Sequence, residues 1–156
     1  MPTIAVINGP NLNRLGRREP EVYGSTTLDE VVEMIRVHAD GLGYDIVAFQ
    51  SNHEGALVDE IHRVADEGVD GMIINAGALT HYSYSLHDAI TAVDLPTVEV
   101  HISDISKREE WRRRSVITDA CFGFIAGHGI QGYLEAMDLL HAHLGRSGAP
   151  DLRVVS

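Results

Sequence analysis

The chain has 156 residues, 44% of them hydrophobic, and carries 12 lysines and arginines against 23 aspartates and glutamates. This length suits one domain with a single core, and the net charge of −11 argues against nucleic acid or an anionic membrane as a partner. The sequence holds no run of the roughly 18 apolar residues that would cross a bilayer, and a first strand that begins almost at the N-terminus indicates no signal peptide. Cys121 is the only cysteine, which excludes an internal disulfide and fits a reducing compartment, so we expect a cytoplasmic protein.

Apolar runs and helical patterns alternate along the chain. Thr3–Ile7 is apolar at successive positions, as expected of a central parallel strand. Four further runs predict strands, at residues 44–50, 71–75, 97–101 and 123–127. Helical periodicity predicts helices at residues 28–42, 54–67, 84–93 and 131–144. Thr27 with Glu30 predicts a capping box at the first helix, and Ser106 with Glu109 predicts another that opens a short basic helix.

Five strands that alternate with helices indicate a parallel sheet covered on both faces. We predict an α/β, flavodoxin-like three-layer sandwich with strand order 2-1-3-4-5, whose ligand site lies at the carboxyl ends of strands 1 and 3. Residues 1–145 are predicted to form the single catalytic domain. Residues 146–156, broken by Gly148 and Pro150, are predicted to form a loose tail.

The connection Gly9–Gly24 is long for a loop between a strand and a helix, and loops of this length are often functional. It holds Arg14, Arg17 and Arg18, followed by Tyr23. Cations and a phenol near the end of a buried strand suggest a lid over an anionic ligand. A solvated surface loop is an equally good interpretation of the same residues.

Two pairs of residues are candidates for proton transfer. Glu99 and His101 are two apart on a predicted strand, so their side chains share a face. A carboxylate fixes the tautomer of an imidazole and favours its protonated form, which predicts His101 as a general acid, the alternative being a structural pair. Tyr23 is a candidate general base if Arg18 stabilises its phenolate, and otherwise a packing residue.

Several other polar residues fall near the predicted crevice. The amides of Asn11, Asn13 and Asn75 are candidates to hold an oxyanion or an ordered water, although Asn in turns often makes only local hydrogen bonds. His81 lies just before a predicted helix, where it would either contact ligand hydroxyls and carboxylates or serve as a capping or buried residue.

Three other chemistries are disfavoured. Residues 127–132 match GxGxxG but follow the last predicted strand, so we interpret them as a tight turn that lets the last helix pack closely. His141 and His143 are two apart on a helix and cannot share a face, and the remaining histidines lack metal-binding spacing. Lys107, the only lysine, falls in an exposed-looking helix, which disfavours a Schiff base. We therefore expect acid–base chemistry on a small oxygenated anion, without a metal or cofactor.

Five stretches, in order and over nearly the whole chain, resemble the type II 3-dehydroquinate dehydratases, and they are INGPNLNRLGRREPEVYG, FQSNHEG, INAGALTH, EVHISDISKREEWRRRS and GIQGY. The resemblance implies a flavodoxin-like subunit, twelve to a particle as four trimers. It also implies a cofactor-free elimination of water from 3-dehydroquinate, which gives 3-dehydroshikimate.

The resemblance implies a role for each of five catalytic residues. Tyr23 removes the proton next to the C3 ketone, while Arg18 stabilises the phenolate and closes with the loop. Asn11 holds the water that stabilises the enolate. His101 protonates the departing C1 hydroxyl, and Glu99 orients the His101 ring.

Seven residues are implied to bind the substrate, and they are Asn75, His81, Asp88, Ile102, Ser103, Arg108 and Arg112. Asn75 with the backbone amides of Ile102 and Ser103 holds the carboxylate, and His81 and Arg112 contact ring hydroxyls. Arg108 helps to position the site, and Asp88 reaches into the site of a neighbouring subunit.

The chain departs from the family pattern near residue 84. Tyr82, Tyr84 and His87 stand where the family reads close to THTSVALRDA, and His128 replaces a small or apolar residue. These departures keep open a relative that acts on a different cyclic keto-acid. A further alternative is a non-catalytic module that binds an anion or nucleotide, with Arg18 and Arg112 as its clamp. The reaction itself fits either aromatic amino-acid biosynthesis through shikimate or quinate breakdown.

Overall fold

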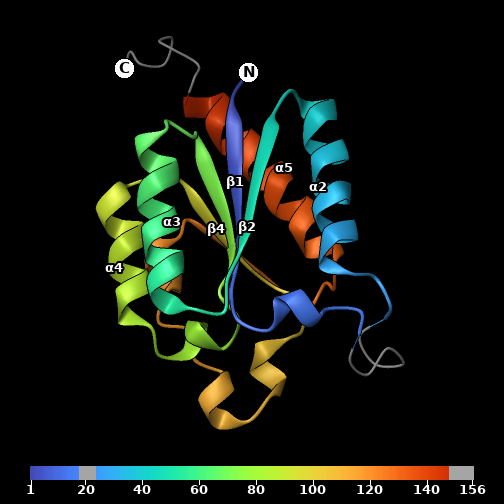
Figure 1. The fold of residues 1–156 in the computed structure, drawn as a ribbon, viewed down its shortest axis with the longest axis vertical. Coiled ribbons are helices and arrows are strands. Elements are labelled where there is room, and N and C mark those ends of the chain that lie inside the picture. Colours follow the sequence, from blue (N-terminus) through green and yellow to red (C-terminus); the bar gives the residue numbers. More distant parts are fainter. Residues whose placement is uncertain (18–23, 148–156) are drawn as a thin grey trace.

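The predicted strands form one parallel sheet in a computed structural model, which describes residues 1–17 and 24–147 (Figure 1). The strands are β1 (Thr3–Asn8), β2 (Asp45–Gln50), β3 (Gly71–Asn75), β4 (Thr97–His101) and β5 (Gly123–Ala126). Their order is β2-β1-β3-β4-β5, which confirms the predicted flavodoxin-like topology. Because the chain runs outward in opposite directions from β1 and β3, the carboxyl ends of these two strands border the crevice.

Helices cover both faces of the sheet. They are α2 (Leu28–Leu42), α3 (Glu54–Asp66), α4 (Tyr84–Val93) and α5 (Gln131–Ser147). Figure 1 shows α3 and α4 on one face of the sheet and α2 and α5 on the other. This arrangement confirms the three-layer sandwich.

The alternation of side chains along β1 explains why both faces are covered. Ile4 and Val6 belong to the apolar cluster shared with α2 and α5, whereas Ala5 and Ile7 belong to the cluster shared with α3 and α4. All four are buried. Successive residues of a strand point to opposite faces, so a strand that is apolar at every position supports two cores at once.

The start of α2 forms as its sequence predicts. The Thr27 hydroxyl accepts a hydrogen bond from the Glu30 backbone N–H, and the Glu30 carboxylate accepts one from the Thr27 backbone N–H. These two bonds are the predicted capping box. Val31, Ile35 and Ala39 then form the buried face of the helix.

The second predicted capping box is wrong. Two short 3₁₀ turns, Ile105–Lys107 and Glu110–Arg112, replace the predicted helix. Asp104, not Ser106, caps the first of them, since its carboxylate accepts from the Ser106 backbone N–H at 3.0 Å and from the Ser106 hydroxyl at 2.6 Å. These two bonds also lower the pKa of Asp104. In the predicted box the Ser106 N–H would donate to the Glu109 carboxylate, but here the nearer Asp104 carboxylate accepts it.

The turn between β5 and α5 supports the tight-turn interpretation. A Cβ on Gly132 would lie 3.3 Å from Ile125 and 3.4 Å from Val100, so glycine lets α5 begin against the sheet. α5 continues through Ser147, so the predicted tail begins with helical residues, and residues 148–156 lie outside the described ranges. The domain boundary at residue 145 stays a prediction. Over the described ranges, no helix combines the length and apolar character that a bilayer crossing requires.

Candidate active site

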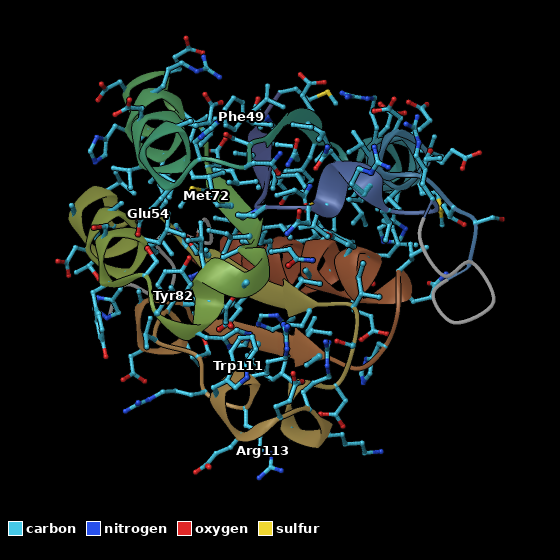
Figure 2. The ribbon with its side chains drawn as sticks, turned by 60° about the horizontal axis from the view of Figure 1, so that its bottom comes forward. Phe49, Glu54, Met72, Tyr82, Trp111 and Arg113 are labelled. Carbon is cyan, nitrogen blue, oxygen red and sulfur yellow. The ribbon has the colours of Figure 1, made fainter. Side chains whose placement is uncertain are left out.

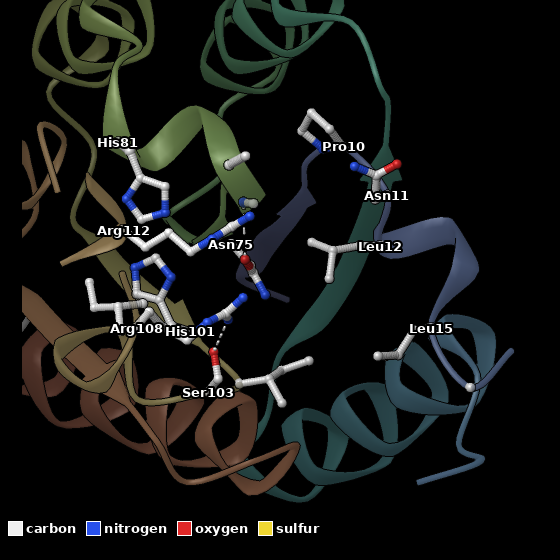
Figure 3. A pocket seen from close by; sticks show the side chains of 15 residues that line it. Pro10, Asn11, Leu12, Leu15, Asn75, His81, His101, Ser103, Arg108 and Arg112 are labelled. Carbon is white, nitrogen blue, oxygen red and sulfur yellow. Dashed lines mark hydrogen bonds between the residues drawn. The ribbon is translucent and has the colours of Figure 1, made fainter. Parts of the chain in front are cut away.

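A cavity of about 280 Å³ opens at the carboxyl ends of β1, β3 and β4. Eight of the predicted site residues line it, and they are Asn11, Asn75, His81, His101, Ile102, Ser103, Arg108 and Arg112. Figure 3 shows their imidazoles and guanidiniums gathered on one side, with Leu12 and Leu15 across from them. The convergence of strand ends that the topology predicts is therefore present.

Two backbone segments come into close contact beside the cavity, the one after β1 and the one after β3. The Gly9 N–H donates to the Asn75 carbonyl at 2.7 Å. A Cβ on Gly9 would lie 2.5 Å from the Ala76 carbonyl oxygen, and one on Gly77, whose φ is +59°, would lie 2.9 Å from the Pro10 carbonyl oxygen. Glycine at both positions lets the segments after β1 and β3 lie against each other.

The candidate acid is held by a buried carboxylate. His101 Nε2 lies 2.5 Å from Glu99 Oε2, and Glu99 is 0% exposed. Glu99 also accepts hydrogen bonds from the Ser115 hydroxyl at 2.7 Å and the Thr118 hydroxyl at 2.6 Å. Three donors satisfy the carboxylate, as a buried charge requires. Because Glu99 takes the Nε2 proton, Nδ1 is the nitrogen of His101 that is left for a ligand.

The sequence did not identify Ser115 and Thr118 as hydrogen-bond donors to Glu99. Ser115 lies in irregular chain, and Thr118 begins the 3₁₀ turn Thr118–Ala120. Neither belongs to a periodic pattern, so no sequence signal placed them beside Glu99. A carboxylate predicted on a buried strand does imply that hydrogen-bond donors lie near it, but it does not indicate which residues supply them.

Two cations border the cavity from the segment after β4. Arg108 donates to the Ser103 hydroxyl at 3.1 Å, as Figure 3 shows. Arg112 lies with its guanidinium carbon 4.0 Å from the centre of the Trp111 ring, and its Nε is 3.1 Å from Glu109 Oε1. A hydrogen bond from its own backbone lowers the pKa of Glu109, and the contact with Arg112 lowers it further. Both arginines are therefore held in place at the edge of the cavity, where an anion would meet them.

His81 lies on the same side of the cavity as Arg112, at the end of the 3₁₀ turn Gly77–His81 (Figure 3). Its Nδ1 lies 2.7 Å from the Arg114 carbonyl oxygen, so Nδ1 carries a hydrogen and Nε2 is the nitrogen left for a ligand. The Trp111 ring meets the imidazole edge-on at 5.7 Å. Figure 2 looks onto this edge of the sheet and labels Trp111 there. Trp111 thus supports both His81 and Arg112.

Residues at and just after the end of β2 form hydrogen bonds with the segment that carries Asn11. The Asn11 N–H donates to Asn52 Oδ1 at 2.9 Å, and Asn11 itself has a left-handed φ of 71°. Gln50 Nε2 donates to the Gly9 carbonyl at 3.1 Å and to Asn13 Oδ1 at 3.5 Å. Within the described chain, Asn13 does not line the cavity, which favours its local role over a role in binding.

Three predicted residues cannot be placed at this cavity. Arg18 and Tyr23 lie outside the described residues. Asp88 lies on α4 with its side chain 84% exposed, 3.3 Å from His87 Nδ1, and does not line the cavity of its own chain. Its predicted contact with a neighbouring subunit's site stays a prediction.

The histidines of α5 face different surroundings. His141 Nδ1 lies 3.1 Å from the Tyr44 hydroxyl, whereas His143 stacks on Phe122 with ring centres 4.2 Å apart. The two imidazoles therefore do not converge. Across the described ranges, no cluster of three histidine, cysteine, aspartate or glutamate side chains is arranged to hold a metal ion.

Cys121 is predicted to be unreactive in the folded protein. Burial, together with the nearby charge of Glu99, raises the pKa of its thiol to about 12. At pH 8 we expect iodoacetamide to alkylate Cys121 slowly in the native protein and rapidly in urea, where the pKa returns to about 8.5. Stability should fall as pH rises above about 8.5, because the unfolded chain then loses a proton that the folded chain keeps. Mass spectrometry follows the alkylation, and rapid labelling of the native protein would contradict the prediction.

Residues 2–141 match the family model for dehydroquinase class II. The 3-dehydroquinate dehydratase of Caldicellulosiruptor saccharolyticus is 55% identical over 145 residues, which span 93% of this chain and 100% of that protein. The 3-dehydroquinate dehydratase of Ruegeria pomeroyi is 53% identical over 150 residues, which span 96% of this chain and 99% of that one.

A solved structure gives the same result. The type II dehydroquinase from Butyrivibrio crossotus matches with a TM-score of 0.86 and 45% identity, covering 89% of this chain and 97% of that one. The strand order, the position of the cavity and these similarities all agree with the resemblance found in the sequence. The chain belongs to the class II dehydroquinase family.

Proposed function

We propose that the protein is a 3-dehydroquinate dehydratase that removes water by anti elimination through an enolate. The observation that carries this proposal is the Glu99–His101 pair, which faces a cavity bordered by Arg108 and Arg112 in a chain of this family. An acid and two cations in one small cavity suit a substrate that has both a carboxylate and a leaving hydroxyl group.

The acid half of the reaction uses His101. In the protonated ring, Nε2–H is donated to Glu99, and Nδ1–H is available to the departing C1 hydroxyl. As the C1–O bond breaks, Nδ1 gives its proton to that oxygen, which leaves as water. The negative charge of Glu99 stabilises the imidazolium before this step and keeps the ring in place.

The base half uses Tyr23 and Arg18, as the family resemblance implies. The phenolate takes the proton from C2, and the electron pair moves onto the C3 oxygen as an enolate. When the C1–O bond breaks, the pair returns to form the double bond between C1 and C2. Asn11 lines the cavity, which supports its proposed role of holding the water that stabilises the enolate.

Substrate binding is divided between two strand ends. Asn75, after β3, and the backbone amides of Ile102 and Ser103, after β4, hold the carboxylate. His81 and Arg112 contact ring hydroxyls, and the Arg108 guanidinium fixes the segment that carries Ser103. In this proposal the neutral amides orient the bound carboxylate, and the charged guanidiniums attract the anion to the cavity.

Twelve subunits arranged as four trimers, with Asp88 presented to a neighbouring site, remain part of the proposal. Light scattering would measure the mass. The departures Tyr82 and Tyr84 are each 62% exposed, and neither they nor His87 line the described cavity. These three residues therefore lie outside the cavity of their own chain, and a competition assay with another cyclic keto-acid tests whether they change the substrate.

The deciding experiment is direct turnover. Purified protein with 3-dehydroquinate should develop the ultraviolet absorbance of a conjugated enone, and Tyr23→Phe should abolish it while circular dichroism shows the fold intact. Chelator should have no effect, and borohydride should trap no adduct. A metal requirement or a trapped imine would rule out this mechanism, and binding without turnover would identify an anion-binding module instead.

A further inference from the structure

Three polar side chains form a hydrogen-bonded chain in the core directly beneath the cavity. The Tyr133 hydroxyl donates to Asn8 Oδ1 at 2.7 Å and accepts from Asn75 Nδ2 at 2.9 Å. Asn8 and Asn75 are register partners at the carboxyl ends of β1 and β3, and Tyr133 comes from α5. Tyr133 and Asn8 are 0% and 1% exposed and lie in the interior, whereas Asn75 also lines the cavity.

A phenol at this depth is not explained by packing. Tyr133 belongs to the apolar cluster between the sheet and α2 and α5. Phenylalanine would fill nearly the same space without burying a hydroxyl, which is unfavourable to bury unless hydrogen bonds compensate its desolvation. Burial raises the pKa of Tyr133 far above its ordinary value, with the Asn75 bond acting in the opposite direction, so the hydroxyl keeps its proton. The hydroxyl is therefore a permanent donor to Asn8.

The direction of these bonds determines how the Asn75 amide is turned. Because the Tyr133 proton goes to Asn8, the hydroxyl oxygen can only accept from Asn75, and Nδ2 must face it. On the other side, Asn75 Oδ1 accepts from the Gly77 N–H at 3.2 Å. Both contacts require the same amide orientation. An amide nitrogen carries two hydrogens, and the second is left for the cavity that Asn75 lines.

We propose that Tyr133 is a positioning residue, whose hydroxyl holds the Asn75 amide so that an N–H, and not a carbonyl oxygen, is presented to the cavity. This wall then selects a hydrogen-bond acceptor such as a carboxylate and disfavours a hydroxyl that must donate. Arg108 and Arg112 supply attraction for an anion, while Asn75 supplies the direction in which the anion binds. The inference rests on the proposed function for its kinetic test.

The first test is Tyr133→Phe, measured by steady-state dehydration of 3-dehydroquinate. Removing the hydroxyl frees the Asn75 amide to turn, and we expect kcat/KM to fall about 10- to 100-fold, the equivalent of one lost hydrogen bond to a buried group. Asn8→Ala should also lower kcat/KM, because the Tyr133 proton, left without its acceptor, then competes for Asn75 Oδ1. This second variant keeps the test available should Tyr133→Phe not fold.

The chain offers a matched control in Tyr44. This tyrosine is 7% exposed in the same apolar cluster and bonds to His141 at 3.1 Å, at the opposite end of the sheet. Burial, and secondarily the charge of Asp70, raises the pKa of its phenol as well. Tyr44→Phe should lower stability but leave kcat/KM within about twofold, since its hydroxyl is remote from the cavity.

A double-mutant cycle separates positioning from general destabilisation. In an Asn75→Ala background, Tyr133→Phe should cause no further loss of kcat/KM, because the group it positions is gone. Losses that multiply would show that Tyr133 acts only on the fold, and they would overturn the proposal. A Tyr44→Phe loss as large as that of Tyr133→Phe would overturn it too.

A second readout does not depend on turnover. The side-chain NH₂ signals of Asn75, assigned by their disappearance in Asn75→Ala, should shift and exchange faster in Tyr133→Phe but not in Tyr44→Phe. If the wild-type protein does not convert 3-dehydroquinate, the proposed function fails, and these signals alone decide the present inference. Signals that stay unchanged in Tyr133→Phe would overturn it.

Discussion

His101→Ala is expected to lower kcat for the dehydration of 3-dehydroquinate by about 10²- to 10⁴-fold, the usual contribution of one general acid. The reason is geometric. His101 lines the cavity and contacts the buried carboxylate of Glu99, so alanine removes the proton donor and leaves that carboxylate without its imidazole partner. Initial rates followed by ultraviolet absorbance, with KM measured in parallel, would show the loss in kcat.

The control for His101 is another histidine–glutamate pair on the same chain. His128 Nδ1 lies 2.6 Å from Glu135 Oε1, but His128 is exposed and does not line the described cavity. His128→Ala should leave kcat unchanged. Glu99→Gln should lower kcat in the same direction as His101→Ala but less, since the ring stays in place while its counter-charge is lost. Full activity in His101→Ala would contradict the assignment of the acid.

The second large effect is expected at Gly9. Gly9→Ala places a methyl group 2.5 Å from the Ala76 carbonyl oxygen and 2.7 Å from the carbonyl carbon, and both atoms are backbone. Backbone cannot rotate aside as a side chain can, so the segments after β1 and β3 must separate. We expect the free energy of unfolding to fall by about 3 kcal/mol, at the upper end for overpacked sites, and the cavity to lose activity with it. Urea unfolding followed by the fluorescence of Trp111, the only tryptophan, measures the change.

Gly41→Ala is the matched control for Gly9→Ala. Gly41 lies inside α2, and a Cβ there would have no heavy atom of the described chain within 4 Å. In a helix interior alanine is preferred to glycine, so the same substitution should stabilise the protein by about 0.5–1 kcal/mol. If Gly9→Ala behaved like Gly41→Ala, the close approach of the two backbones would not be a requirement of the fold.

The sequence predicted those features that follow from periodicity and topology. Glu99 and His101 share a face because they are two apart on a strand, and the strand order brings His101 to the same edge as Asn75. Both inferences need only the regular geometry of a parallel sheet. The same regularity predicted that helices cover both faces of the sheet, although the sequence indicated a single core and the structure has an apolar cluster on each face.

The features that the sequence missed lie in irregular chain. Ser115 and Thr118 reach Glu99 from a segment without periodicity, so nothing local indicates where it runs. Ser106 and Glu109 match the capping-box pattern, but Ser106 donates its backbone N–H and its hydroxyl to the Asp104 carboxylate instead. In such segments several hydrogen-bonding solutions differ by little free energy, and tertiary contacts choose among them.

The proposed acid and base belong to different parts of the architecture. His101 ends a central strand and has its counter-charge already in place beneath it, whereas Tyr23 is carried by the connection that leaves β1. The position of the acid is therefore determined by the sheet and its buried core, whereas that of the base depends on a connection outside the sheet. A substitution of Tyr23 should therefore act on the proton abstraction that starts the proposed reaction, and one of Glu99 on the proton transfer that ends it.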